Sequence, residues 1–79
     1  MSTFAIKAEP FAVEVSFSDN DLIVQLADGR RICVPLAWFP RLLNASPQQR
    51  SDWRLIGGGI GIHWPAVDED VSVESLLAA

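Results

Sequence analysis

Three consecutive glycines, Gly57 to Gly59, separate two apolar runs, and this arrangement constrains the fold more than any other feature. The runs Trp53–Ile56 and Ile60–Trp64 place large apolar side chains at alternate positions, which is the period of a strand with one buried face. Glycine adopts the positive φ angles that tight turns require. The sequence therefore predicts a β-hairpin reversed at the glycines. The side chains expected to face the core are Trp53, Leu55, Ile60, Ile62 and Trp64.

The first half of the chain has the pattern of an antiparallel meander. Apolar and polar residues alternate over Val13–Phe17 and Leu22–Ala27, and a turn is predicted at Ser18–Asp21 between them. Asp28-Gly29 is the dipeptide best suited to a tight hairpin, and it leads into a third predicted strand over Arg30–Val34. We expect three strands, each paired with the next.

Short helices are predicted after the third strand. Apolar residues recur at helical spacing near residues 38–44, with Pro40 in the first turn, where its missing N–H costs nothing. Ser46, Pro47 and Gln49 then form the pattern of a capping box, which predicts one helical turn that ends near Asp52.

The C-terminal segment predicts a last helix that begins after Ser72, which can cap it. The acidic cluster Asp68–Asp70 would then lie near the positive end of that helix. The predicted fold is an α+β domain over residues 1–79. Its two layers are an antiparallel sheet of about five strands, comprising the three-stranded meander and the second hairpin, and the short helices with the C-terminal helix.

Size and composition favour one folded intracellular domain. The 79 residues allow a single core, and 49% hydrophobic with 20% charged residues is a globular balance. A single cysteine, Cys33, forms no intramolecular disulfide, which favours a reducing compartment, and we expect it to be a packed, inert thiol. Residues 1–7 lack a secretory pattern, and no apolar stretch reaches membrane-spanning length. We expect a cytoplasmic protein without a membrane anchor.

Charge is segregated along the chain. Residues 1–29 and 55–79 each carry a net charge of −4, whereas residues 30–54 carry +4. Two interpretations are open: the basic middle meets the acidic ends internally, or a basic face and an acidic face bind partners. The whole chain, at −4 with a pI near 4.6, would repel nucleic-acid phosphates.

Candidate chemistry centres on His63 and the acids that follow it. A general base or a divalent-cation site would draw on Asp68, Glu69 and Asp70, but three adjacent acids diverge, and no second histidine or cysteine has metal-ligand spacing. The glycines lack the strand-to-helix context of a dinucleotide loop. We therefore predict no catalytic residue, no metal and no cofactor, and His63 is interpreted as structural.

The three tryptophans have two interpretations. Trp38, Trp53 and Trp64 can fill the core, because each lies in an apolar run. Alternatively, Trp38 and Phe39 protrude from the short helix as an anchor, since aromatic and arginine side chains are typical of interface hot spots. The neighbouring arginines of this candidate surface are Arg41, Arg50 and Arg54.

Several segments together carry a family resemblance. They are Val34–Ala45, Gln49–Trp53, Gly57–Ile60, Ile62–Pro65 and Asp68–Leu77. The composite pattern resembles the small prokaryotic family called domain of unknown function 2442. The resemblance implies an α+β fold with helices on one side of an antiparallel sheet, and no established activity or catalytic residues.

Members of that family often lie beside another small uncharacterised protein in a pairing like a toxin–antitoxin operon, which implies an antitoxin-like role by association. Some relatives carry an added C-terminal helix-turn-helix domain. Because this sequence ends at Ala79, the resemblance gives no ground for transferring DNA binding to it.

We therefore expect a non-enzymatic protein-binding module, antitoxin-like toward a small, basic, toxin-like protein. Its candidate surfaces are the acidic segment His63–Asp70 and the aromatic and basic segment Trp38–Arg54. The alternative is a nucleic-acid-binding autorepressor, which would use the basic segment. Its arginines are Arg30, Arg31, Arg41, Arg50 and Arg54. Self-association into a homo-oligomer is left open.

Overall fold

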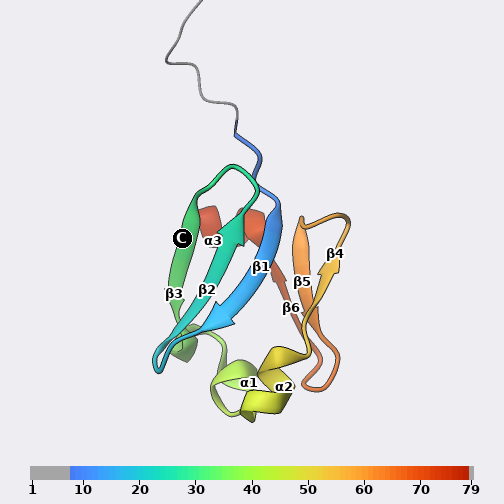
Figure 1. Ribbon diagram of the computed structural model, residues 1–79. Helices are drawn as coiled ribbons and strands as arrows, with labels where there is room; N and C mark the ends of the chain where they lie inside the picture. The colour runs from blue at the N-terminus through green and yellow to red at the C-terminus, as the bar shows by residue number, and fades with distance from the viewer. Residues whose placement is uncertain (1–7, 79) are drawn as a thin grey trace, which may run out of the picture.

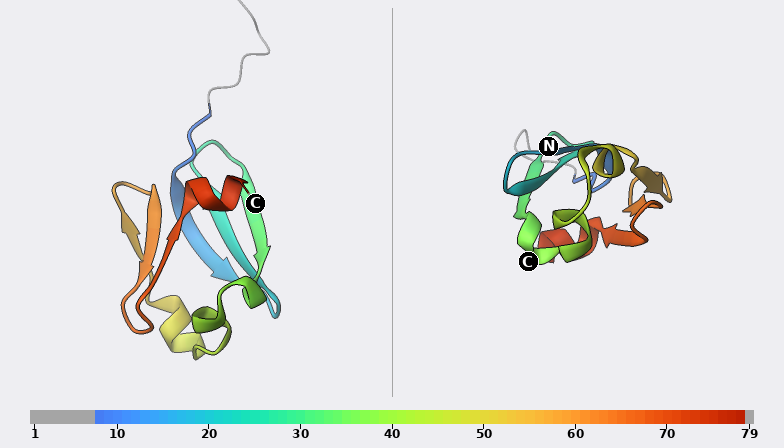
Figure 2. Two further views of the ribbon diagram at one scale, coloured as in Figure 1. Left: turned by 180° about the vertical axis from the view of Figure 1, so that it is seen from behind. Right: turned by 90° about the horizontal axis from the view of Figure 1, so that it is seen from below.

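The protein is built from two three-stranded antiparallel sheets joined by short helices (Figure 1). The structure is a computed structural model that describes residues 8–78, so the expectation about residues 1–7 lies outside the described residues. The short central helices lie at one end of the molecule, and the C-terminal helix lies near the other end (Figure 2). The predicted α+β class is confirmed, but the single sheet of about five strands is wrong.

The first sheet is the predicted meander. It consists of β1 (Ala12–Phe17), β2 (Asp21–Leu26) and β3 (Arg31–Pro35), in the order β1-β2-β3. The central strand directs every second side chain inward, so that Leu22, Val24 and Leu26 are buried. Because burial recurs at every second residue, the alternation in the sequence correctly predicted this strand.

The second sheet contains one strand more than the sequence predicts. It consists of β4 (Arg54–Ile56), β5 (Gly61–Trp64) and β6 (Glu69–Ser72), in the order β4-β5-β6. The hairpin between β4 and β5 is confirmed, and all three turn glycines have positive φ.

The sequence predicted that the acidic cluster lies at the start of the last helix, and this prediction is wrong. Asp68 ends a turn, whereas Glu69 and Asp70 begin β6, which pairs with β5. Only Val71 of this strand is buried. A short strand with one inward side chain has a polar composition, so the alternation that identifies a strand is missing.

The helices are short and begin where the sequence predicts. A 3₁₀ turn, η1 (Leu36–Trp38), precedes α1 (Pro40–Leu43) and α2 (Pro47–Ser51). Both hydrogen bonds of the predicted capping box at α2 are present. The last helix, α3 (Val73–Ala78), begins after Ser72, whose Oγ accepts a hydrogen bond from the Ser75 N–H at 3.1 Å.

The core lies between the two sheets and is centred on Trp64. This side chain is completely buried, its Nε1–H donates to the Arg50 carbonyl oxygen at 3.0 Å, and its ring meets Phe17 edge to face. Three predicted core positions are wrong. Leu55 lies on an edge strand, Ile60 lies in the hairpin turn, and Cys33 lies on the outer face of the first sheet, so all three are exposed.

A backbone hydrogen bond joins the two sheets where the start of β1 meets the β4–β5 hairpin. The Ala12 N–H donates to the Gly59 carbonyl oxygen at 2.7 Å. A Cβ on Gly59 would lie 2.9 Å from the Ala12 nitrogen and closer still to its carbonyl oxygen, so the approach requires glycine. Away from this point β1 pairs only with β2, and β4 only with β5. The edges of β1 and β4 therefore border an open seam between the sheets.

Candidate functional site

The predicted histidine lies in a charged row across the outer face of the second sheet. Arg54 of β4 is opposite His63 of β5, which is opposite Asp70 of β6. The His63 ring Nδ1 forms a hydrogen bond with the Asp70 carboxylate. These three predicted site residues are thus brought together, and they form a cross-strand row of polar side chains on the outer face of the sheet.

The other two predicted acids do not converge on His63. Asp68 has a positive φ of 52° in the turn before β6, and its carbonyl oxygen accepts a hydrogen bond from Arg41 Nη1 at 2.5 Å. The Glu69 carboxylate accepts from the Asp70 backbone N–H at 3.1 Å. Within residues 8–78, no group of three His, Cys, Asp or Glu side chains is arranged to hold a metal ion.

Trp38 and Phe39 differ in burial: Trp38 is exposed, as an anchor would be, whereas Phe39 packs against the core. Trp38, at the end of η1, is 54% exposed, so it is available as an anchor. Phe39 is half-buried and packs against the core. Arg41 is exposed on α1 and reaches the turn before β6. The structure thus places Trp38 and Arg41 on the surface and gives Phe39 a role in packing.

Arg50 serves the fold. Its Nε and Nη2 donate to the carbonyl oxygens of Leu42 and Leu43, both at 2.9 Å, and its guanidinium lies 5.6 Å from the centroid of the Phe17 ring. These contacts satisfy carbonyls at the C-terminal end of α1, where a helix leaves its last acceptors without intrahelical donors. The guanidinium is therefore engaged within the protein.

The other ion pair between described residues joins Arg30 to Asp28 at 2.8 Å. The Arg30 guanidinium holds the pKa of the Asp28 carboxyl well below its usual range, and the backbone N–H groups of Glu9 and Arg30 act in the same direction. The same pairing raises the pKa of Arg30. In this contact the basic middle of the chain meets a carboxylate of the acidic first block.

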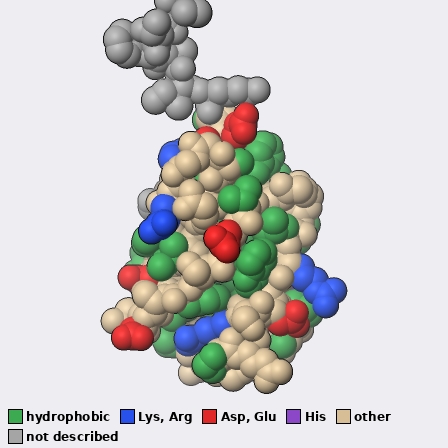
Figure 3. Space-filling view, in the orientation of Figure 1, with side chains coloured by type: hydrophobic (Ala, Val, Ile, Leu, Met, Phe, Trp, Pro, Cys, Tyr) green, Lys and Arg blue, Asp and Glu red, His purple; other side chains and the backbone are tan. Residues whose placement is uncertain are grey.

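The arginines do not form one basic face. Arg30 and Arg31 flank the start of β3, Arg41 and Arg50 lie on the central helices, and Arg54 lies on β4. The central helices and the start of β3 are at opposite ends of the molecule in Figure 1, and Figure 3 shows the basic side chains apart from one another.

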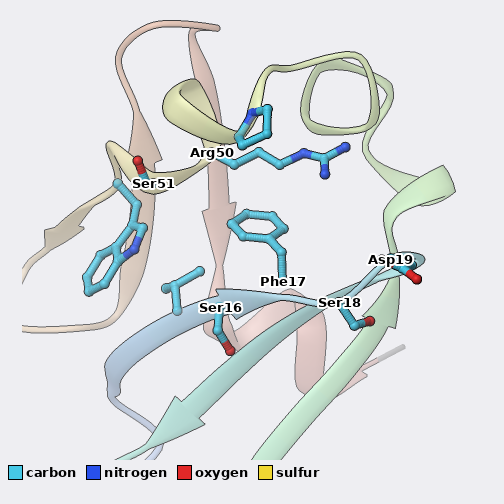
Figure 4. A pocket seen from close by; sticks show the side chains of 9 residues that line it. Ser16, Phe17, Ser18, Asp19, Arg50 and Ser51 are labelled. Atoms are coloured by element: carbon cyan, nitrogen blue, oxygen red, sulfur yellow. The ribbon is translucent and has the colours of Figure 1, made fainter.

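A groove of about 510 Å³, which the sequence did not predict, lies beside the second half of β1. We call it the β1 groove. Its lining residues are Val15, Ser16, Phe17, Ser18, Asp19, Pro47, Arg50, Ser51 and Trp53. Its volume is within the ~300–1,000 Å³ typical of ligand pockets. Figure 4 shows the Phe17 ring and the Arg50 side chain projecting into the space between β1 and α2.

The β1 groove lies along the unpaired edge of β1. The Ser18 N–H donates to the Asp21 carbonyl oxygen, and Ser16 lies opposite Ile23. Antiparallel ladders alternate, so the backbone groups of Ser16 and Ser18 point to β2, and those of Val15 and Phe17 point away from it. Sequence alone could not reveal this edge, because an alternating pattern does not distinguish an edge strand from a central one.

Exposed apolar side chains border the seam above the groove. They are Phe11, Val13, Leu55, Ile56 and Ile60, which we call the seam face. Phe11 and Ile60 also line a second, apolar hollow of about 420 Å³ beside α3. In Figure 3 hydrophobic side chains gather over β1 and the neighbouring hairpin.

These features define a small α+β domain with two three-stranded antiparallel sheets and one open strand edge beside a groove. The model of the family described as protein of unknown function (DUF2442) matches residues 12–79, so the chain belongs to this family, as the sequence resemblance indicated.

A solved structure from Rhodospirillum rubrum ATCC 11170, described as a protein of unknown function, has a similar fold. It is 28% identical, covers 86% of this chain and 84% of its own, and has a TM-score of 0.73. No curated protein matches the sequence significantly. In the described part of the chain, no helix is both long and apolar enough to cross a bilayer.

Proposed function

We propose that this protein is a non-catalytic protein-binding module that binds its partner through the seam face. The observation that carries the proposal is that five exposed apolar side chains lie beside and on the first half of β1 and on the β4–β5 hairpin, where Figure 3 shows hydrophobic side chains gathered. Single exposed apolar residues are ordinary, whereas contiguous ones mark interaction surfaces. Ile60, at 55% exposed on the hairpin turn, is the most accessible of the five.

The hypothesis of an antitoxin-like role, with a small toxin-like protein as partner, fits this surface. An apolar surface on an acidic chain suits a basic partner, because complementary charge raises the association rate while apolar contacts supply affinity. The exposed thiol of Cys33 suits a reducing cytoplasm, where such a thiol persists. Trp38 and Arg41 form a second candidate contact on the central helices.

Co-purification from the native host tests the proposal. The chain, tagged at its own locus, is recovered at native abundance, and bound proteins are quantified by mass spectrometry. We expect one small basic protein in near-equal amount, and at least tenfold less of it with Ile60→Asp. Leu43→Asp is the matched control, since Leu43 is similarly exposed but lies on α1, away from the seam face. Trp38→Ala tests the second contact.

Recovery of the chain without a stoichiometric partner would overturn the proposal. Equal loss of partner with Ile60→Asp and Leu43→Asp would contradict the assignment to the seam face. The autorepressor alternative predicts binding of the chain to its own promoter DNA that weakens steeply with salt. No observation in the structure favours it, because the arginines are spread over the molecule.

A further inference from the structure

We propose that the β1 groove binds an extended segment of a partner protein, which adds to β1 as a new strand. The segment places a bulky apolar side chain between Phe17 and Trp53 and basic side chains at the rim. This inference rests on the proposed function and names its recognition mode. Strand addition uses main-chain hydrogen bonds for affinity and alternate side chains for specificity.

The backbone of β1 supplies the first requirement. Val15 and Phe17 direct their N–H and C=O groups away from β2 and toward the groove. Above them the Ala12 N–H is already bonded to Gly59, so the sheets are joined there. The open stretch of edge therefore begins below Ala12. A polypeptide in extended conformation is the ligand that matches such alternating donors and acceptors.

The walls of the groove supply the second requirement. On one side is β1, and on the other are α2 and Trp53, which is half-buried. Figure 4 shows the Phe17 ring turned into the groove, with the Ser16 side chain pointing the opposite way. A segment bound along β1 directs every second side chain between Phe17 and Trp53, where an aromatic or large aliphatic group displaces water from apolar surface.

The rim of the groove selects the charge of the partner. Asp19 lines the groove, and Asp52 lies between the lining residues Ser51 and Trp53; both acids are exposed. Arg50 is engaged by the carbonyls of α1. Its guanidinium keeps its positive charge, so the acidic part of the groove is the end at Asp19, and that end attracts a basic side chain.

The same acids disfavour a second copy of this chain as the occupant. Pairing of two β1 edges would bring the acidic side chains of both copies, Glu14 and Asp19 in each, onto one strand pair. Like charges on neighbouring strands are destabilising. A heterologous basic segment meets no such repulsion.

A designed peptide tests the proposal on the full chain. The probe is the fluorescein-labelled peptide TKVKFKVT, which alternates basic and apolar residues. We expect saturable binding by fluorescence anisotropy, with the largest amide shifts in NMR spectra at Val15 and Phe17 and a shift of the Trp53 indole. The acidic peptide TEVEFEVT is expected to bind at least tenfold more weakly.

Backbone methylation of the probe tests strand addition itself. One variant is N-methylated on alternate residues along one edge, and a second on those along the other edge. Because only one edge of the peptide faces β1, methylation of that edge is expected to weaken binding at least tenfold and methylation of the opposite edge less than twofold. Equal binding by both variants would overturn strand addition.

Charge reversal at the rim provides the matched protein variants. Asp19→Lys and, separately, Asp52→Lys are expected to weaken binding of TKVKFKVT at least fivefold. Glu74→Lys makes the same change of charge on exposed α3, away from the groove, and is expected to alter binding less than twofold. Circular dichroism establishes that each variant is folded. Equal weakening by all three would reduce the effect to net charge and overturn the assignment to the rim.

Three outcomes separate this inference from the proposed function. A native partner lost with Ile60→Asp but retained by both rim variants would leave the proposed function intact and overturn the groove assignment. A dimer in analytical ultracentrifugation whose Val15 and Phe17 amides are protected would make the second copy the occupant and overturn the inference. Peptide binding in the groove without any native partner would support the inference and contradict the proposed function.

Discussion

The two sheets have the same number of strands, but the burial pattern of the first is visible in its sequence and that of the second is not. The first sheet alternates half-buried and buried residues along β2, and its strands are five or six residues long. The second has strands of three or four residues, and all three residues of β4 are exposed. The first sheet is specified by its own pattern, whereas the second depends on tertiary packing, above all on the packing of its own buried Trp64.

This difference explains where the candidate binding surface lies. An edge strand exposes backbone donors and acceptors, and native proteins usually cover or shorten such edges. The β3 edge of the first sheet is contacted by α3. The β1 edge borders the seam, where the short β4 does not reach it to form hydrogen bonds. The incomplete second sheet therefore leaves one long edge of the complete first sheet open.

Replacement of Trp64 tests the dependence of the second sheet most severely. Trp64→Ala removes the largest buried side chain and its hydrogen bond to the Arg50 carbonyl, so we expect a loss of about 3–5 kcal/mol in the free energy of unfolding. For a domain of this size that loss is a large part of the total free energy of unfolding. Urea unfolding followed by circular dichroism measures it, and a loss below about 1 kcal/mol would contradict the central role of Trp64.

The junction between the sheets is tested at the glycines. Gly59→Ala forces a Cβ against the Ala12 backbone at a φ of 112°, and we expect a loss of about 3 kcal/mol. Gly58→Ala is the control: its φ is also positive, but the added Cβ meets nothing, so the expected loss is about 1 kcal/mol. Equal losses in thermal unfolding would show that the sheets do not depend on this contact.

The contribution of Arg50 to stability can be compared with that of Arg54, which is exposed. Arg50→Ala removes the donors to Leu42 and Leu43, and we expect a loss of about 2 kcal/mol in unfolding free energy. Arg54→Ala, at an exposed position on β4, is expected to change stability by less than about 0.5 kcal/mol. If Arg50→Ala left the unfolding free energy unchanged, the Arg50 guanidinium would not be needed for the fold, which would contradict its assigned role.

The smallest effect is expected at Asp28, in the hairpin of the first sheet. Its pKa is lowered in the folded state, so the carboxylate stabilises the fold above the unfolded pKa of about 4, and that contribution is lost as the pH falls toward the folded pKa. Asp28→Asn should melt at a lower temperature than the parent at pH 7, and the difference should shrink as the pH falls below about 4. A difference that stays constant down to pH 2.5 would contradict the assigned pairing with Arg30.

The parts of the fold that were predictable have local causes. The meander follows from alternation in β2 and from Asp28-Gly29, and the start of α2 follows from the Ser46 capping box. These signals act within a few residues, so they are legible without tertiary context. The hairpin at the glycines was predicted for the same reason.

The parts that were not predictable depend on distant segments. Strand β6 is a strand because β5 supplies its hydrogen-bond partners, and its acidic start hides it. Of the predicted site residues, Arg54, His63 and Asp70 do share a row, but Arg50 serves the fold and Asp68 points its carbonyl to Arg41. Phe17 and Trp53, 36 positions apart in sequence, line the same β1 groove, and no pattern in either segment predicts that they do.

Amide hydrogen exchange along β1 tests most directly whether this edge is open in solution. The N–H groups of Ser16 and Ser18 point to β2, whereas those of Val15 and Phe17 point into the groove. The account predicts slow exchange at Ser16 and fast exchange at Val15 and Phe17. Exchange at Ser18 is expected to be intermediate, because this residue lies next to the turn between β1 and β2. Slow exchange at all four amides would show that the edge is already paired and would contradict the account.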